Sequence, residues 1–170
     1  MELDYIKIKT ENDGIMYGGC QNLFGEKVRK SGCGMIAVCD MLLFLRGKTA
    51  KPETMEKYRK YAESFRDNIA YKRRRNLIGI SPFRAAKMLS EHSCGRKFRF
   101  YSKIKFTRHK LSEYIKFSLE NGLPVIVRIG ANGKKLPYDI VYPASNRHAQ
   151  GKMTWHYITV TGISEDTLVF

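Results

Sequence analysis

Residues 31–45 read SGCGMIAVCDMLLFL, and this stretch predicts the central helix of the fold. From residue 35 to residue 45 only Asp40 carries a charge, so the segment is apolar nearly all round. Such a composition is typical of a helix in a domain core rather than of an amphipathic surface helix. Ser31 is a suitable N-cap and Gly47 a suitable C-terminal stop, so we expect a buried helix between these two residues.

Cys33 lies in the first turn of this predicted helix. The positive end of the helix dipole and the unpaired backbone N–H groups of that turn favour the thiolate, which is the nucleophilic form of cysteine. Gly32 and Gly34 flank Cys33 and leave room for a substrate backbone to approach the sulfur. The alternative is a cysteine packed as a small hydrophobic residue, as free cysteines often are. A cysteine nucleophile also requires a histidine from elsewhere in the chain.

The length and composition of the chain predict one domain covering residues 1–170. A chain of 170 residues with 43% hydrophobic residues can bury one core. Its longest apolar run, residues 35–45, is shorter than the ~18 residues that a membrane span needs. The first five residues, MELDY, lack the basic and apolar regions of a signal peptide. We therefore expect a soluble, cytoplasmic protein without a membrane span.

The cysteines indicate a reducing compartment rather than a disulfide scaffold. The chain has four of them, and they form no CxxC pair: Cys20, Cys33, Cys39 and Cys94. The nearest grouping of metal-ligand types, His92 with Cys94, is too small for a zinc site, so we expect no metal and no cofactor. Cys20 either forms a redox-sensitive pair with Cys33 or fills space as a small side chain.

The formal net charge of +15 would suit an anionic partner such as nucleic acid. Basic residues are spread along the chain, however, and only residues 71–75, YKRRR, form a dense cluster. No recognised nucleic-acid motif accompanies that cluster. A solvated basic surface is the favoured interpretation, and a nucleic-acid-binding module centred on residues 71–75 is an alternative.

The remaining pattern predicts helices first and an antiparallel sheet last, which describes an α+β fold. A short strand and a turn come first, at residues 5–9 and 12–14, and a glycine-rich loop and a charged, exposed approach to the buried helix follow at residues 16–25 and 26–30. Three further helices are expected, over residues 54–67, 82–95 and 110–121. The last part predicts two strong strands, at residues 123–130 and 154–162, with a long loop at residues 131–153 between them. A turn at residues 164–167 and a returning strand at residues 168–170 follow.

Alternation along the second strong strand divides its side chains between two faces. His156, Ile158 and Val160 share one face, and Tyr157 and Thr159 share the other. A histidine that begins a strand can be held in place by the sheet. His156 is therefore the candidate partner of the Cys33 thiol.

These motifs together resemble papain-like cysteine peptidases. The likeness lies in Gln21 within YGGCQ, in GCG at residues 32–34, in LPVIV at residues 123–127 and in HYITVTG at residues 156–162. It is closest to the double-glycine peptidases that process bacteriocin leaders and to their stand-alone bacterial relatives. The resemblance covers residues 17–45 and 123–170 and leaves residues 46–122 as a helical, insert-like segment.

The resemblance implies a papain-like fold and a cysteine peptidase or amide-bond hydrolase that works through an acyl-enzyme. Cys33 would be the nucleophile, His156 the base and then the acid, and Gln21 a donor to the oxyanion. The substrate would be a peptide or another amide or acyl compound, and the same chemistry would serve acyl transfer to an amine. Nucleic acid is not implied as a partner.

The family pattern leaves several alternatives open. It places the Asp or Asn that orients the histidine just beyond Phe170. Three alternatives follow: the chain is truncated at its C-terminus, another group orients His156, or the protein is an inactive relative that binds a peptide or an anionic partner. Gln21 and His156 also have a purely structural interpretation. Gln21 would then cap a backbone group in its loop, and His156 would be a half-buried strand residue hydrogen-bonded to a carbonyl. His148, in the long loop, is the second choice of partner for Cys33, whereas His109 is expected at the surface.

Overall fold

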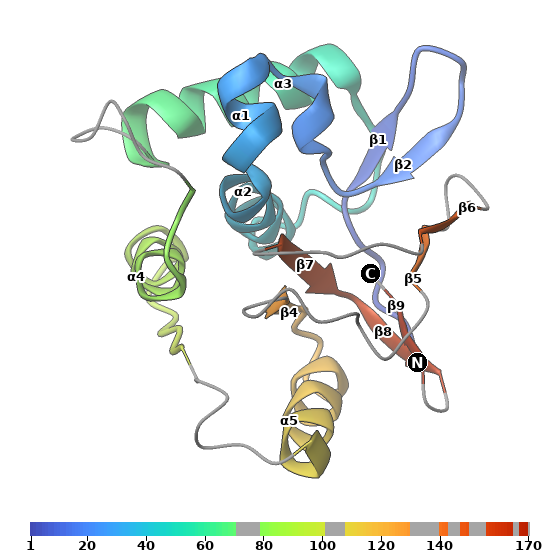
Figure 1. Ribbon diagram of the computed structural model, residues 1–170, viewed down its shortest axis with the longest axis vertical. Helices are drawn as coiled ribbons and strands as arrows, with labels where there is room; N and C mark the ends of the chain where they lie inside the picture. The colour runs from blue at the N-terminus through green and yellow to red at the C-terminus, as the bar shows by residue number, and fades with distance from the viewer. Residues whose placement is uncertain are drawn as a thin grey trace.

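The computed structural model describes residues 1–70, 79–100, 108–129, 140–142, 147–149, 156–164 and 167–169. Within these residues the fold is mixed, with α-helices arranged around small β-sheets (Figure 1). The predicted α+β class is therefore confirmed. No helix in the described ranges has both the length and the apolar character needed to cross a membrane.

The N-terminal part forms a small three-stranded sheet. Strand β1 (Lys7–Lys9) pairs antiparallel with β2 (Ile15–Tyr17) and parallel with β3 (Glu53–Thr54). Asp13 takes a positive φ of 57° in the turn between β1 and β2, which confirms the strand and the turn predicted there. The prediction of an irregular loop over residues 16–25 is partly wrong, because β2 enters it and the 3₁₀-helix η1 (Gln21–Leu23) lies within it.

The buried helix is α2 (Cys33–Leu45), and a short helix α1 (Glu26–Ser31) leads into it. The prediction of Ser31 as its N-cap is wrong, because Ser31 is the last residue of α1 and Gly32 occupies the cap without a side-chain bond. Gly32 keeps near-helical backbone angles (φ −86°, ψ −6°), so the chain passes from α1 to α2 with little interruption. Gly47, with φ of 71°, ends α2 as predicted.

The next two helices begin at residues whose side chains cap them. Helix α3 (Met55–Phe65) starts where the Lys57 backbone N–H donates to Thr54 Oγ1 at 3.3 Å. Helix α4 (Pro82–His92) starts where the Arg84 N–H donates to Ser81 Oγ at 3.3 Å. Helix α5 (Arg108–Glu120) is followed by Gly122 with φ of 70°. All three predicted helices are thus confirmed.

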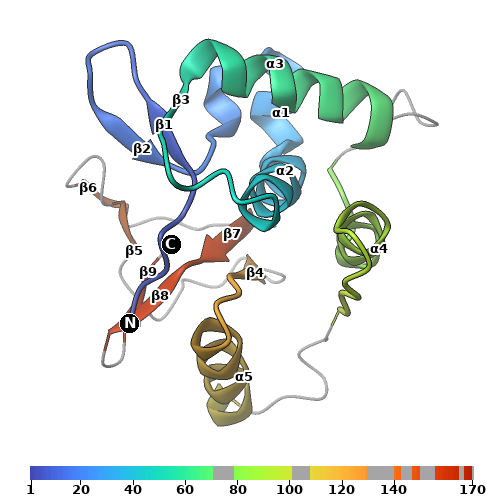
Figure 2. The ribbon, with the colours of Figure 1, turned by 180° about the vertical axis from the view of Figure 1, so that it is seen from behind.

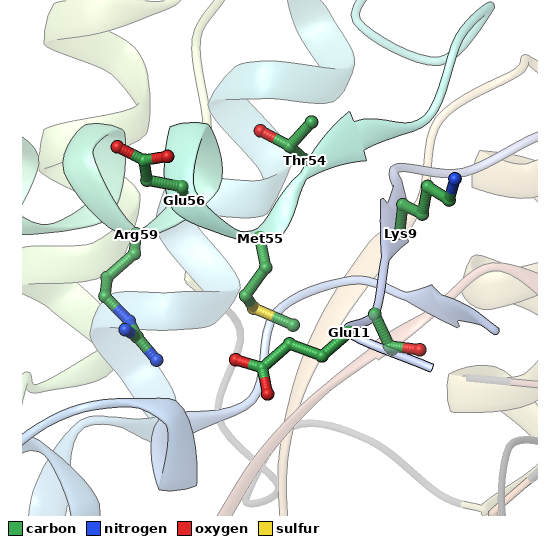
Figure 3. A pocket seen from close by; sticks show the side chains of 7 residues that line it. Lys9, Glu11, Thr54, Met55, Glu56 and Arg59 are labelled. Atoms are coloured by element: carbon green, nitrogen blue, oxygen red, sulfur yellow. The ribbon is translucent and has the colours of Figure 1, made fainter. Parts of the chain in front are cut away.

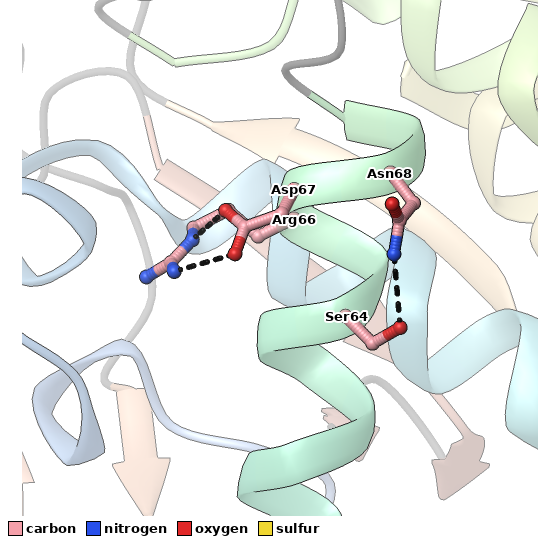
Figure 4. Close-up of polar contacts among 4 residues, drawn as sticks. All are labelled: Ser64, Arg66, Asp67 and Asn68. Atoms are coloured by element: carbon pink, nitrogen blue, oxygen red, sulfur yellow. Dashed lines mark hydrogen bonds and ion pairs between the residues drawn. The ribbon is translucent and has the colours of Figure 1, made fainter.

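Helix α3 continues into the π-helical turn η2 (Arg66–Ala70), whose polar side chains are tied locally (Figure 4). Arg66 Nε donates to Asp67 Oδ1 at 2.7 Å, and Asn68 Nδ2 donates to Ser64 Oγ at 3.2 Å. These contacts are exposed. They stabilise the end of α3 without reaching the central helix.

The C-terminal part supplies antiparallel strand pairs. Strand β4 (Val125–Ile129) pairs with β7 (His156–Val160), and β8 (Gly162–Ser164) pairs with β9 (Thr167–Val169). The strands and returning strand predicted here are confirmed. Helix α2 lies on one side of the β4–β7 pair and α5 on the other, in both views (Figures 1 and 2).

The long loop predicted over residues 131–153 is wrong in the parts that the structure describes. Strands β5 (Ile140–Tyr142) and β6 (Arg147–Ala149) pair antiparallel there, with Val141 opposite His148. The β-branched pair Ile140 and Val141 favours a strand, and the glycine and polar residues around it conceal this preference in the sequence. The rest of residues 131–153 lies outside the described part.

The larger of two hydrophobic clusters surrounds α2. Residues 34–43 are all buried, which confirms the predicted buried helix. The side chains packed with α2 come from the N-terminal strands and from α3 and α4, and they include Ile6, Ile8, Tyr58, Phe65, Met88 and Leu89. The smaller cluster joins Ile115 and Leu119 of α5 to Ile158 and Val160 of β7.

Candidate functional site

Cys33 is the first residue of α2 and is partly exposed, whereas the ten residues after it are buried. The first residue of α2 is thus partly exposed, while the residues that follow it are packed in the core. Backbone N–H groups of a first turn and the positive end of the helix dipole stabilise a thiolate at this position. A cysteine at this position is a candidate nucleophile.

Tyr157 of β7 packs directly on the start of α2. A β-carbon built on Gly34 would lie 3.0 Å from the Tyr157 ring atoms Cδ2 and Cε2, so glycine permits this close approach. The Tyr157 hydroxyl donates to the Ile80 carbonyl at 2.7 Å. Burial raises the pKa of Tyr157 to about 12, with Arg128 opposing the rise and the electrostatic effect of Cys33 adding to it. Tyr157 therefore stays protonated and ties β7 to both α2 and the chain entering α4.

His156 precedes Tyr157 and is half-buried, and that burial lowers its pKa from the usual value. A lowered pKa keeps the imidazole neutral near pH 7, which is the form that a general base needs. Because side chains alternate along a strand, His156 shares the face of Ile158 and Val160, which pack with α5. The structure brings the strand of His156 against α2, but it places Tyr157 rather than His156 opposite Gly34.

Gln21 lies in η1 and is bonded to the helix that leads to Cys33. Its Nε2 donates to the Arg29 carbonyl at 2.9 Å, and its Oε1 is buried without a hydrogen-bond partner among the described residues. An amide nitrogen carries two hydrogens, so this contact uses one of them. Gln21 and Cys33 are 12 positions apart, and η1 and α1 occupy most of the residues between them.

A buried carboxylate beneath this loop was missed by the sequence argument. Asp40, 3% exposed, accepts hydrogen bonds from the Gly19 N–H through Oδ2 and from the Tyr58 hydroxyl through Oδ1, both at 2.7 Å. We name these three residues the Asp40 clamp. Burial raises the pKa of Asp40 to about 6, against the opposing effect of the two hydrogen bonds. A lone acid in an apolar helix does signal a buried partner, but sequence alone does not name that partner.

The clamp explains both glycines of the YGGCQ motif. Gly18 has a φ of 69°, a conformation that favours glycine. A β-carbon on Gly19 would overlap the Tyr58 hydroxyl. The turn that precedes Cys20 and Gln21 is therefore shaped to fit onto Asp40 and Tyr58.

Other predicted candidates contribute no geometry to this site. The side chains of His109 and His148 and the basic residues 71–75 lie outside the described part. Cys94 is exposed, and none of the four cysteines, all of which the structure describes, forms a disulfide. Among the described residues, no group of three or more His, Cys, Asp or Glu side chains is arranged to hold a metal ion.

A pocket of about 300 Å³ lies elsewhere, between the β1–β2 hairpin and the start of α3 (Figure 3). Its lining is mixed in charge and contains none of the candidate site residues: Lys9, Thr10, Glu11, Thr54, Met55, Glu56 and Arg59. Lys9 pairs with Asp13 at 2.8 Å, and Glu56 pairs with Lys60 at 2.7 Å. Because this pocket contains none of the candidate residues, we place the candidate site at the start of α2 and not in this pocket.

No family model matches the chain, and neither the curated proteins nor the solved structures include a significantly similar one. A function is therefore argued from the residues at the start of α2. Fold class alone does not determine an activity, whereas the chemistry of a site restricts it.

Proposed function

We propose that this chain is a papain-like cysteine hydrolase that cleaves a peptide or another amide bond through a thioester at Cys33. The observation that supports the proposal is the accessible thiol at the start of a helix whose next ten residues are buried. The strand that carries His156 packs on the same helix. Gln21 donates a hydrogen bond to the Arg29 carbonyl of α1, the helix that precedes α2.

In the proposed reaction neutral His156 takes the proton of the Cys33 thiol, and the resulting thiolate attacks the carbonyl carbon of the amide, forming a C–S bond. Protonated His156 gives its proton to the amine as the C–N bond breaks, which leaves a thioester and neutral histidine. Water then attacks the thioester, His156 takes its proton, and a carboxylic acid and the thiolate are released. A Gln21 Nε2–H and first-turn N–H groups of α2 would stabilise both oxyanions.

A second candidate is a non-catalytic relative that binds a peptide or an anionic partner in the same place. The alternation of β7 favours it, because that alternation groups His156 with Ile158 and Val160 rather than with Tyr157. The hydrolase requires the imidazole to reach the sulfur from the first position of the strand. The two candidates therefore differ in the reactivity of Cys33.

The test is the rate of iodoacetamide labelling at each cysteine near pH 6, mapped by mass spectrometry. The chain supplies its own references, since Cys94 is exposed and Cys39 is fully buried. An activated Cys33 should react at least ~10-fold faster than Cys94 despite its lower exposure, because more of it is thiolate at this pH. Cys33→Ala should abolish the fast labelling.

Two neighbouring substitutions locate the base. His156→Ala should slow the labelling of Cys33 near pH 6 and move its pH profile toward that of Cys94. Tyr157→Phe is the matched control, because it keeps the ring on Gly34 and should leave the profile in place. Labelling of Cys33 no faster than that of Cys94 would contradict the hydrolase and favour the binding protein.

A further inference from the structure

We propose that Asp40 is a positioning residue for the Cys33 site, holding the Gly18–Gly19 turn so that Gln21 is aligned with the first turn of α2. The catalytic meaning of this inference rests on the proposed hydrolase. The mechanical link between Asp40 and the loop is measurable without it.

Asp40 and Cys33 belong to the same rigid helix and to nearly the same side of it. Seven residues separate them, which is close to two helical turns and about 10 Å along the axis. Gly19 is fixed on Asp40, and the two residues from Gly19 to Gln21 span at most ~7 Å. From there the Gln21 side chain reaches the end of α1, where its Nε2 donates to the carbonyl of Arg29, four positions before Cys33.

The loop is held at its far end as well. Gln21 Nε2 donates to the Arg29 carbonyl, which orients the amide, and Phe24 follows η1 directly. The Phe24 ring lies 6.5 Å from that of Tyr58, centroid to centroid. Tyr58 thus contacts the loop after Gln21 and, through Asp40, holds it before Gln21. Residues 18–24 are therefore bracketed by one buried pair from α2 and α3.

The clamp also changes with protonation. The charged Arg46 acts on Cys39 and Tyr61. Among the described residues, Asp40 itself interacts with four ionisable groups: Tyr5 ahead of β1, Cys39 on α2, and Tyr58 and Tyr61 on α3. Burial raises the pKa of each of them, so they stay neutral between pH 5 and pH 7. Asp40 changes charge in that range, and a carboxylate accepts the Gly19 N–H more strongly than a carboxylic acid does.

Cys20 reports on the loop, because it lies between Gly19 and Gln21 and is partly exposed. In Asp40→Ala the Gly19 N–H loses its acceptor, so iodoacetamide should label Cys20 at least ~10-fold faster than in the wild type. Cys39 should stay protected and Cys94 should be unchanged. Asp40→Asn should restore a nearly wild-type rate, since its Oδ1 can accept from Gly19 while its Nδ2 donates to Tyr58.

Whether Gln21 is aligned to stabilise an oxyanion is tested by comparing the rates at which two reagents modify Cys33. Acetylation by p-nitrophenyl acetate develops an oxyanion, whereas alkylation by iodoacetamide does not. Asp40→Ala should therefore slow acetylation of Cys33 ~10-fold or more and leave its alkylation nearly unchanged. Gln21→Ala should have the same selective effect, and the double variant should be little worse than either single one.

The results separate this inference from the proposed hydrolase. An unchanged Cys20 rate in Asp40→Ala, or an equal rise at Cys20 and Cys39, overturns the positioning of the loop by Asp40. If Asp40→Ala does not fold, Tyr58→Phe removes one bond of the clamp and should raise the Cys20 rate about 3-fold, and no rise overturns the inference. Slow alkylation of Cys33 in the wild type instead contradicts the hydrolase and leaves the Cys20 comparison valid.

Discussion

Helices α2 and α5 have the same length, 13 residues, and lie on opposite sides of the β4–β7 pair, yet their surroundings differ (Figure 2). Ten consecutive residues of α2 are buried. In α5 only Ile115 and Leu119 are buried among the side chains that the structure describes. Its large exposed apolar residues are Leu111, Tyr114 and Phe117, at 44%, 53% and 65% exposure.

The comparison shows why the candidate nucleophile belongs to α2. Strands and helices from both parts of the chain pack on α2, so its first turn is held in one position. Helix α5 packs on one side only and serves to cover the sheet. A reactive group needs fixed geometry, which a helix packed on several sides provides better than a covering helix.

Leu42→Ala should have the largest effect on the comparison. Leu42 is fully buried in the cluster around α2, so truncation removes apolar contacts and leaves a cavity that its packed neighbours cannot fill. We expect a loss of about 3–5 kcal/mol in the free energy of unfolding, measured with urea. A loss below about 1 kcal/mol would show that α2 is less tightly packed than described.

Asp40 should make the stability of the α2 region depend on pH. Its pKa rises from 3.8 to about 6 on folding, so the folded state binds its proton more tightly than the unfolded state. The stability that this proton provides is present below pH 4 and lost as pH rises through 6, by about 3 kcal/mol in total. The free energy of unfolding should be measured with urea for the wild type and for Asp40→Asn from pH 3.5 to pH 8. As pH rises, the wild type should lose about 3 kcal/mol relative to the variant. A constant difference would refute the buried, titrating carboxylate.

Leu119→Ala tests the other helix. Leu119 is 1% exposed, but it belongs to the smaller cluster of α5 and β7, where fewer neighbours maintain a cavity. The expected loss is about 2–3 kcal/mol, below that of Leu42→Ala in the same urea measurement. Equal losses would mean that both helices belong to equally well packed cores.

Phe117→Ala should have the smallest effect. Phe117 lies two positions before Leu119 on α5 but is 65% exposed, so its truncation removes little buried surface. The free energy of unfolding should change by no more than about 0.5 kcal/mol. A loss close to that of Leu119→Ala would show that the outer side of α5 is covered in solution.

Sequence patterns predicted the elements wherever local chemistry decides them. Thr54 and Ser81 cap helices, Gly47 and Gly122 end them, and the apolar run of α2 is buried. The N-cap at Ser31 failed because the charged residues 26–31 form a helix of their own, stabilised in part by the pair Lys30–Glu26. Their polarity predicts a charged, exposed approach to the buried helix and does not show that this approach is itself helical.

The candidate site was predicted only in part, for a related reason. The place of Cys33 at a helix start follows from local sequence, and so does the face of β7 that His156 shares. The partners of Asp40 come from positions 18 residues later and 21 residues earlier, and no local pattern specifies such contacts. Likewise, only the tertiary structure shows that Tyr157 packs on Gly34.

The hydrogen bond from Tyr157 to the Ile80 carbonyl has a consequence for folding during synthesis. It joins residues 77 positions apart, and its donor lies near the C-terminal end of the sequence. Most of the cluster around α2 comes from residues 5–65, which leave the ribosome much earlier. We expect that cluster to collapse first and the start of α4 to be fixed only when β7 arrives, since distant contacts form slowly. The packing of β7 on the first turn of α2 would then form only after the helix that carries Cys33 is already in place.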